Sequence, residues 1–374
     1  MKKLLFATCC IAFLSGSLGA AAQKKSAAKN VLTQTLKGKS WSADNGNGTF
    51  TNPLFYDEFS DPDIIRVGED YYLAGTTMHC VPGLVVLHSK DLVNWEFSSY
   101  CFDRLDDSDD FNLRNGKEAY GQGIWAPAIR YHNGKFYIFS NINGHGLQVY
   151  ISDSAKGPWT HHKVNGDIYD LSVLFDEDGK IYAVHKYGNV TVTELKPDLS
   201  GPVEGSSKVV IPEGNAMGEG HHIYKINGMY YILSADYSPM GRMQCARSKS
   251  IWGPYETCVI SERESYGYAA GWSVGNMGIG RPLPEDGFNF QNNKPNGLNL
   301  GCATIHQGGI VQAPDGKWWG VSMQDFNAVG RTVCLSPVTW VDGWPYFGLE
   351  KNLGRSPRTW FKPNDMVKTP QAPY

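Results

Sequence analysis

The sequence has no excess of charge of either sign. Its 374 residues include 34 Lys and Arg against 37 Asp and Glu, a formal net charge of -3 at pH 7. Proteins that bind nucleic acid or an anionic membrane surface by electrostatics carry a clear basic excess or basic clusters. We therefore expect neither nucleic acid nor an anionic lipid surface as a partner.

Long apolar runs are missing apart from one at the N-terminus. Two lysines precede a mostly apolar stretch at residues 4–18, and small residues follow around Ala22. This order is typical of a secretory signal peptide, and the apolar stretch is too short to span a membrane. The sequence predicts a signal peptide over residues 1–22, cleavage near Ala22, no membrane span, and a mature protein that is periplasmic or secreted.

The sequence also lacks the cysteine pairs of a zinc site. Of the eight cysteines, two lie within residues 1–22, and the other six form no Cys-x-x-Cys motif. An exported protein can form disulfides. Cys245 and Cys258 could bridge neighbouring strands, but buried free thiols explain them equally well.

Helical periodicity is essentially missing, whereas glycine and aromatic residues are abundant, with 42 Gly and 13% aromatics. A turn glycine followed by a short aromatic or aliphatic strand occurs five times, and Asn or Asp precedes the glycine in four of these copies. That dipeptide is the strongest short hairpin signal. The copies span residues 68–73, 134–138, 179–183, 228–232 and 316–320.

These five equivalent hairpins predict the architecture. A short antiparallel sheet cannot bury both of its faces alone, but five such sheets packed radially can, which is a β-propeller. A β-sandwich is the structural alternative, although it does not predict five equivalent hairpins. We expect an all-β, five-bladed β-propeller over residues 51–362, preceded by a linker at 23–50 and followed by a tail at 363–374.

The repeat also indicates which residues meet at the propeller axis. The innermost strand of each blade lines the central channel, so residues seven to ten positions before each hairpin glycine should converge. Those residues are Asp61, Trp125, Asp170, Glu219 and His306. Any one of the three acids could lie at a strand end for structural reasons. Three carboxylates at equivalent positions are harder to explain structurally, because buried charge is costly unless it is paired.

Carboxylates gathered around one funnel fit the chemistry of glycoside hydrolysis. One carboxyl group must be protonated to donate to the leaving oxygen, and another must be ionised to activate water or attack directly. A third carboxylate beside the acid would raise the pKa of that acid by like-charge repulsion. The pattern therefore favours hydrolysis of a sugar, and aromatic side chains suit the faces of sugar rings.

At these residues the sequence resembles glycoside hydrolase family 43, whose members are five-bladed propellers, from about Asn52 to Trp360. The segment 60–64 (SDPDI) resembles the general-base motif, in which the base directly precedes Pro, and this implies Asp61 as the base. Asp63, two positions further along the chain, is the local rival for this role.

The segment 219–225 (EGHHIYK) resembles the general-acid motif and implies Glu219 as the general acid, with Glu213 as the alternative outside the repeat register. The segment 170–179 resembles the stretch that carries the pKa-modulating Asp, which implies Asp170. The family often has Pro after that Asp, and Leu follows it here, so Asp167 remains a competitor.

Three further motifs imply the residues around the sugar. The segment 123–128 (GIWAPA) resembles the second-blade motif and implies Trp125 and Ala126 beside the terminal sugar. The segment 330–331 (GR) implies that Arg331 reaches sugar hydroxyls, although a surface role would also fit. The segment 306–311 (HQGGIV) implies that His306 lies under the site, bound to water or to a central cation. The resemblance thus implies no required cofactor but allows a structural calcium at the propeller axis.

The family inverts anomeric configuration and is dominated by β-xylosidases and α-L-arabinofuranosidases, which implies release of β-D-xylose or α-L-arabinofuranose from xylan, arabinoxylan or arabinan fragments. The segment 340–345 (WVDGWP) leans toward this exo-acting branch. Many relatives there carry a C-terminal β-sandwich beside the active site, and Tyr374 lies about where it would begin, so exo action stays open. The alternatives are an endo-arabinanase or exo-galactosidase of the same clan, and a non-catalytic glycan-binding propeller.

Overall fold

The five predicted hairpins form the inner half of five antiparallel sheets. The computed structural model describes residues 42–105, 108–215, 217–237, 240–261, 305–325, 330–354 and 359–363. The hairpin glycines all have positive φ, between 65° and 83°, a conformation that glycine adopts without steric cost. The one helical element among the described residues is a short 3-10 helix, η4 (Glu350–Asn352).

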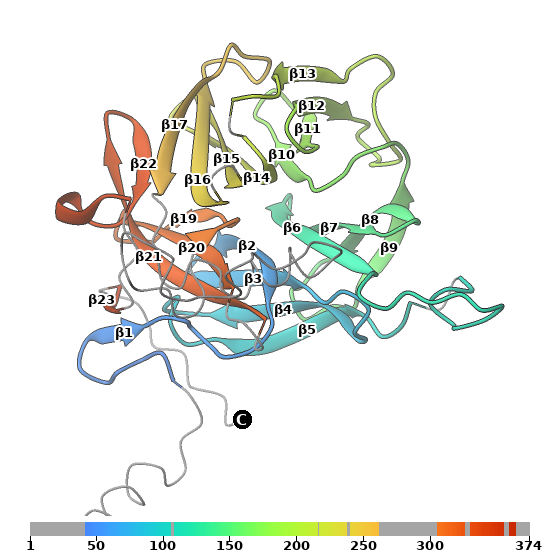
Figure 1. Cartoon of the computed structure of the whole chain (residues 1–374), viewed down its shortest axis with the longest axis horizontal. Coiled ribbons are helices and arrows are strands. Elements are labelled where there is room, and N and C mark those ends of the chain that lie inside the picture. Colours follow the sequence, from blue (N-terminus) through green and yellow to red (C-terminus); the bar gives the residue numbers. More distant parts are fainter. Residues whose placement is uncertain are drawn as a thin grey trace, which may run out of the picture. The chain divides into compact units, whose positions relative to one another are not determined.

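The sheets follow one another along the chain as blades 1 to 5, and together they form the five-bladed β-propeller that the repeat predicts (Figure 1). Blade 1 consists of β2 (Ser60–Val67), β3 (Asp70–Thr76), β4 (Gly83–Ser89) and β5 (Glu96–Phe102). Blade 2 consists of β6 (Ile124–His132), β7 (Lys135–Ile142), β8 (Gly146–Ser152) and β9 (Thr160–Val164). Blade 3 consists of β10 (Ser172–Phe175), β11 (Ile181–His185), β12 (Val190–Leu195) and β13 (Lys208–Ile211).

Blade 4 consists of β14 (Glu219–Ile226), β15 (Met229–Tyr237), β16 (Met240–Ser248) and β17 (Glu256–Ser261). Blade 5 contains β18 (Ile305–His306), β19 (Ile310–Gln312), β20 (Trp318–Asp325), β21 (Arg331–Val341) and β22 (Trp344–Phe347). In blade 5 both β18 and β19 pair with β20, so the inner strand is interrupted. The inner strands β2, β6, β10, β14 and β19 face the centre of the ring in Figure 1.

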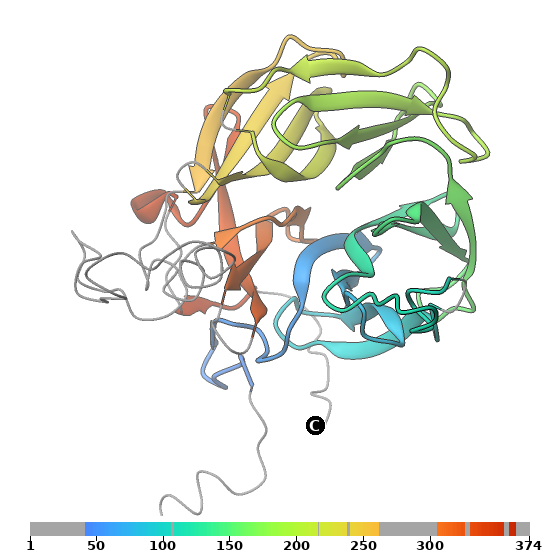
Figure 2. The ribbon, with the colours of Figure 1, turned by 45° about the vertical axis from the view of Figure 1, so that its right-hand side comes forward.

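The hydrophobic core lies between the blades. Each of five clusters of buried apolar side chains joins two neighbouring sheets. Blades 3 and 4, which lie side by side in Figure 2, share one of them, in which Val184 and Val192 pack with Ile223 and Ile232. Because both faces of a blade are covered, strands such as β11 are buried at every position. A blade cut out of the ring would expose both faces, which is why the repeats stabilise one another.

The ring closes between blades 5 and 1. Strand β1 (Thr49–Thr51) pairs with β23 (Thr359–Phe361) in a two-stranded sheet. The segment after β1 then follows β21: the Asn52 side chain bonds both backbone groups of Leu335, at 2.8 and 2.9 Å. Residues 43–50, assigned from sequence to the N-terminal linker, pack here, with Ala43 and Phe50 in the core cluster of blades 1 and 5.

The cysteine pair noted from the sequence lies within blade 4. Cys245 and Cys258 face each other across β16 and β17 and are free thiols in the structure. The Cys258 thiol lies 3.2 Å from the Tyr346 hydroxyl. Cys302 falls outside the described residues, as do residues 1–22. No helix within the described part of the chain is long and apolar enough to cross a bilayer.

Candidate active site

Three of the five inner strands, β2, β6 and β14, carry a bulge where they reach the site end of the propeller. In blade 1, the three steps from Ser60 to Asp63 face two steps on β3, and blades 2 and 4 repeat this between residues 125 and 128 and between 219 and 222. A bulge of this kind leaves one residue unpaired and turns the strand sharply. It therefore aims side chains toward the axis that a regular strand would direct into the sheet.

A residue with left-handed backbone conformation marks the same position in every blade, and it shows that the five residues selected from sequence are not all structurally equivalent. Residues with positive φ occupy the same place in all five blades: Asp61 (50°), Ala126 (37°), Asp170 (51°), Gly220 (67°) and Gln307 (47°). Asp61 and Asp170 are therefore equivalent. Trp125, Glu219 and His306 each precede the left-handed residue by one position. The five residues selected from sequence thus come from two adjacent positions at the site end of the inner strands.

Six of the seven residues predicted for the site line one pocket of about 100 Å³. They are Asp61, Trp125, Ala126, Asp170, Glu219 and Arg331. The remaining lining residues are Met78, Asn141, Tyr169 and Gln307. The side chain of the seventh, His306, lies outside the described part of the structure, so its contact with substrate or a cation stays a prediction.

Asp61 and Arg331 meet across the closure between blades 1 and 5. The Arg331 guanidinium lies 3.2 Å from Oδ1 of Asp61, which is largely buried. The carboxylate of Glu58 accepts the backbone N–H of Arg331 at 2.5 Å, and it fills the space beside Gly330 that any Cβ would need. The arginine is therefore held at its backbone, while its partly exposed side chain reaches the pocket.

Asp170 is the most enclosed of the three acids. Its backbone N–H donates to the Asn141 side chain at 3.0 Å, and its Oδ2 accepts the N–H of Gly220 at 2.8 Å. Burial, and then the nearby carboxylates of Glu219 and Asp61, raise the pKa of Asp170 well above its usual range. The repulsion is mutual, so ionisation of one of these carboxyl groups disfavours ionisation of its neighbours.

Glu219 begins β14 at the wall of the pocket. Its Oε2 lies 3.4 Å from the hydroxyl of Tyr169. The next residue, Gly220, cannot carry a side chain, because a Cβ there would lie 2.5 Å from Gln307 and φ is +67°. Close packing of blades 4 and 5 thus fixes the backbone that presents Glu219.

Trp125 lines the pocket, and its contact with a sugar stays a prediction. Its carbonyl accepts a hydrogen bond from the Ser140 hydroxyl, which holds the strand at the bulge. The indole Nε1–H of Trp125 is buried without a hydrogen-bond acceptor among the described residues. Unpaired buried donors are costly, so this N–H is a locally destabilising feature of the pocket wall.

The three rival acids do not line this pocket. The side chain of Asp63 is fully buried and ion-paired with Arg130. The side chain of Asp167 is 87% exposed and lies 3.2 Å from Lys186. Glu213 is exposed outside the pocket. Asp61, Asp170 and Glu219 are therefore the acids that the fold brings together.

A hydrogen-bonded network crosses the axis beneath the pocket. Asp63 of blade 1 accepts bonds from Arg130 of blade 2 at 2.5 Å and contacts His222 of blade 4 at 3.0 Å. Arg130 reaches the Ser172 hydroxyl of blade 3, which also accepts the N–H of Ile223. Side chains of four blades thus meet around one buried carboxylate.

This network does not itself offer a site for calcium, and binding of a central cation by His306, which the family resemblance allows, stays a prediction. Calcium needs six to eight oxygen ligands, chiefly carboxylates and carbonyls. Both oxygens of Asp63 are bound by Arg130 and His222, and a guanidinium there repels a cation. Within the described residues no group of three or more His, Cys, Asp or Glu side chains could hold a metal ion. We therefore derive no step through a metal.

The comparison with protein families agrees with this geometry. The family model described as "Glycosyl hydrolases family 43" matches residues 50–267, more than half of the chain. The chain belongs to glycosyl hydrolase family 43. The matched residues contain Asp61, Asp170 and Glu219, so the three pocket acids lie in the part of the chain that defines the family.

Individual relatives carry two kinds of name. A β-xylosidase of Formosa agariphila is 30% identical, over 92% of this chain and 58% of its own length. A non-reducing end α-L-arabinofuranosidase of Bacteroides ovatus is 34% identical, over 80% of this chain and 54% of its own length. This family 43 chain therefore spans a little over half the length of these relatives.

A solved structure of a family 43 enzyme supports the fold. An engineered family 43 glycoside hydrolase, described as displaying both endo-xylanase and exo-arabinofuranosidase activity, superposes with a TM-score of 0.69 at 28% identity. The match covers 87% of this chain and 58% of the solved one. The propeller of this family 43 chain is thus that of its solved relatives.

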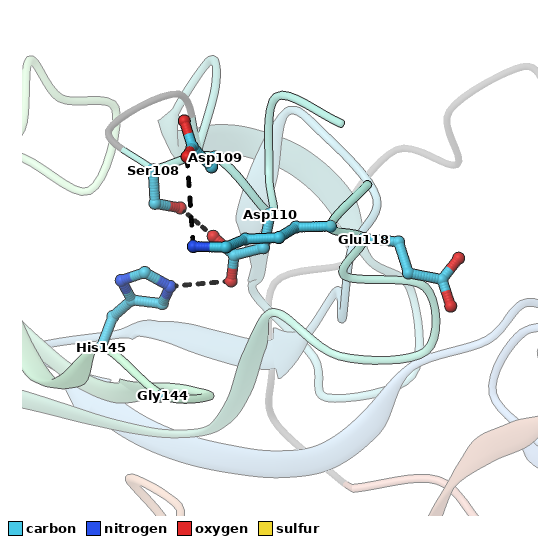
Figure 3. A pocket seen from close by; sticks show the side chains of 7 residues that line it. Ser108, Asp109, Asp110, Glu118, Gly144 and His145 are labelled. Carbon is cyan, nitrogen blue, oxygen red and sulfur yellow. Dashed lines mark hydrogen bonds and ion pairs between the residues drawn. The ribbon is translucent and has the colours of Figure 1, made fainter. Parts of the chain in front are cut away.

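A larger pocket of about 440 Å³ lies elsewhere in the family 43 chain, where the segment before β6 meets the β7–β8 turn (Figure 3). Two of its three acids have partners: Asp110 lies 2.9 Å from His145 and accepts the Ser108 hydroxyl, and Asp109 lies 4.0 Å from Lys117. Hydrogen bonds from His145 and then Ser108 lower the pKa of Asp110. A carboxyl group held ionised in this way cannot serve as a general acid, so size alone does not identify the active site.

Sequence reasoning missed four pocket residues: Met78, Asn141, Tyr169 and Gln307. Tyr169 directly precedes Asp170 and Gln307 directly follows His306, so a wider window around each motif would have included them. Met78 and Asn141 lie on or just after the second strands of their blades, β3 and β7. Only the pairing of those strands with their neighbours brings them to the pocket.

Proposed function

We propose that this family 43 chain is an inverting exo-glycosidase that releases a terminal pentose, β-D-xylose or α-L-arabinofuranose, from plant cell-wall polysaccharides or their fragments. The observation that carries this proposal is the pocket in which carboxylates of three blades surround one small space beside Arg331. The names of its relatives, β-xylosidase and α-L-arabinofuranosidase, support the choice of sugar.

In the proposed mechanism Asp61 is the general base and Glu219 the general acid. Asp61 takes a proton from a water molecule, whose oxygen bonds to the anomeric carbon. Glu219 gives its proton to the glycosidic oxygen, which leaves with the electron pair of the broken bond. Inversion requires room for the water, with carboxyl groups about 6.5–9.5 Å apart.

Asp170 and the pocket wall support these two residues. Asp170 and Glu219 repel each other when both are ionised, so the pair retains a proton, and the mechanism requires this proton to be on Glu219 before it reacts. The face of Trp125 packs against the apolar face of the sugar ring, together with Ala126. Arg331 binds sugar hydroxyls and, through its contact with Asp61, favours the ionised base.

The decisive experiment compares three aryl glycosides: the α-L-arabinofuranoside, the β-D-xyloside and the β-D-galactoside. We expect hydrolysis of one or both pentosides, with the inverted anomer appearing first in the NMR spectrum of the product. Retention of configuration would contradict the mechanism. Preferred cleavage of the galactoside, or of linear arabinan at internal bonds, would instead assign one of the other activities of the clan.

We also propose that residues 1–22 direct export, so that the mature protein acts in the periplasm or outside the cell. This fits polymeric substrates, which do not enter the cytoplasm intact. The N-terminal sequence of the protein recovered from the cell exterior or periplasm should begin at Gln23. A mature protein that still begins at Met1 would contradict the proposal.

A further inference from the structure

Tyr169 of blade 3 and Glu219 of blade 4 are joined through their side chains. The Tyr169 hydroxyl lies 3.4 Å from Oε2 of Glu219. The residues that follow them are joined in the opposite direction, since the N–H of Gly220 donates to Oδ2 of Asp170 at 2.8 Å. Two dipeptides on neighbouring blades therefore hold each other by two hydrogen bonds, one of which ends on the proposed general acid.

Tyr169 can donate a hydrogen bond but cannot replace the acid. Its side chain lines the pocket and is only about one third exposed, at 36%. Burial, and then the negative charges of Glu219, Asp170 and Asp61, raise the pKa of Tyr169 above its usual range. The phenol therefore keeps its proton while the carboxylates around it exchange theirs.

We propose that Tyr169 is a positioning residue that orients Glu219 and stabilises its carboxylate as the proton leaves. This inference rests on the proposed function, in which Glu219 is the general acid. As the glycosidic oxygen takes the proton and departs with the bonding electrons, Glu219 gains a full negative charge. The Tyr169 hydroxyl then donates to that charge and keeps its own proton.

The length of the contact in the free protein agrees with this role. At 3.4 Å it is long for a hydrogen bond between two oxygens, which is usually 2.5–3.0 Å. Catalytic hydrogen bonds are often long in free enzymes and shorten as charge develops. An interaction that is stronger in the transition state than in the ground state raises kcat.

Replacing Tyr169 with Phe should slow the reaction according to the leaving group. Methyl glycosides and oligosaccharides need the proton of Glu219, so kcat/KM for them should fall about tenfold or more, the effect of one hydrogen bond to a charged group. Dinitrophenyl glycosides leave without a proton, so their kcat/KM should stay within about twofold of the wild-type value. An equal loss on both substrates would show a merely structural role and overturn the proposal.

The pH profile gives a second readout. A hydrogen bond to the carboxylate favours the ionised form of Glu219, so its loss raises the pKa of this group. Since Glu219 must be protonated to act, Tyr169→Phe should move the basic limb of kcat/KM to higher pH while lowering the rate. Tyr131→Phe is the matched control, because this exposed tyrosine lies near the end of β6 that is remote from the pocket residue Trp125. It should leave both rate and profile unchanged.

A measurement without substrate separates this inference from the proposed function. In protein labelled with 13C at Glu carboxyl groups, the Glu219 signal is assigned by its loss in Glu219→Gln. Its titration should move to higher pH in Tyr169→Phe. If the wild-type chain hydrolyses no glycoside, the proposed function fails, and this titration still decides whether Tyr169 acts on Glu219. An unchanged Glu219 titration would overturn the inference.

Discussion

Asp63 should be the acid whose removal weakens the propeller most. Its side chain is fully buried, it lies 2.5 Å from Arg130 and 3.0 Å from His222, and it also accepts the backbone N–H groups of Ile64 and Ile129. Asp63→Asn keeps the shape of the side chain but removes its charge. The Arg130 guanidinium would then remain in the interior without its counterion.

The size of the effect follows from this burial. Removing one partner of a buried ion pair costs about 3–5 kcal/mol, because the other charge stays buried and uncompensated. One kcal/mol lowers the melting temperature of a domain of this size by about 2 °C. We therefore expect Asp63→Asn to lower the melting temperature by about 6–10 °C at pH 7.

The stability that Asp63 contributes should depend on pH in a definite direction. Burial raises the pKa of Asp63, but the charges of Arg130 and His222 and their hydrogen bonds outweigh it, so the pKa is lowered overall. The stability that Asp63 contributes is therefore fully present above the pKa of an unfolded Asp, about 3.9. It is lost as the pH falls through the folded value, and Asp63→Asn should remove this part of the acid sensitivity.

Thermal unfolding followed by circular dichroism checks both statements. Asp153→Asn is the matched control, because its 82% exposed side chain forms a surface ion pair with Lys135. Such pairs contribute about 0–1 kcal/mol, so the control should melt within about 2 °C of the wild type. If Asp63→Asn melted as high as this control, the axial ion pair would not stabilise the ring, and the reasoning would be refuted.

Three further predictions concern the pocket and its support. Glu219→Gln should lower kcat on alkyl glycosides about 10²–10⁴-fold, the usual effect of a general acid. Glu118→Gln in the larger pocket should leave kcat unchanged in the same assay. Gly220→Ala should lower both the melting temperature and kcat, because its Cβ would meet a glutamine of blade 5 at 2.5 Å; unchanged values would contradict the close packing. Burial lowers the pKa of His185 and His221 to about 4. Between about pH 6.5 and pH 4 the unfolded chain therefore binds more protons than the folded one, so stability should fall as the pH drops through this range. If stability fell equally steeply in His185→Gln, burial of this histidine would not be the cause.

The fold could be predicted from sequence because its strongest signal is local and repeated. An Asn-Gly or Asp-Gly turn needs only neighbouring residues to form, and five turn glycines followed by short strands, four of them with this dipeptide, leave few architectures. The three pocket acids followed from the same spacing. Counting back from each turn glycine reached the site end of every inner strand, and this end is where Asp61, Asp170 and Glu219 line the pocket.

What could not be predicted depends on pairings between distant residues. A bulge adds one residue to one strand only, so counting could not show that Asp61 is equivalent to Gly220 rather than to Glu219. The sequence does not show that the Asn52 side chain bonds Leu335, because the two residues are 283 positions apart. Tyr169 acquires its role only because Glu219 of the next blade begins beside it.

The closure between blades 1 and 5 runs through the active site itself. The N–H of Phe59 bonds the carbonyl of Arg331 at 2.8 Å, and the Arg331 guanidinium reaches Asp61 at 3.2 Å across the same boundary. In the proposed mechanism a substrate lies against residues from both ends of the ring and would therefore hold the two ends together. Substrate occupancy and ring integrity are thermodynamically linked, since any ligand that binds only the closed ring stabilises it by mass action. In this propeller the two ends of the ring therefore join at the candidate active site.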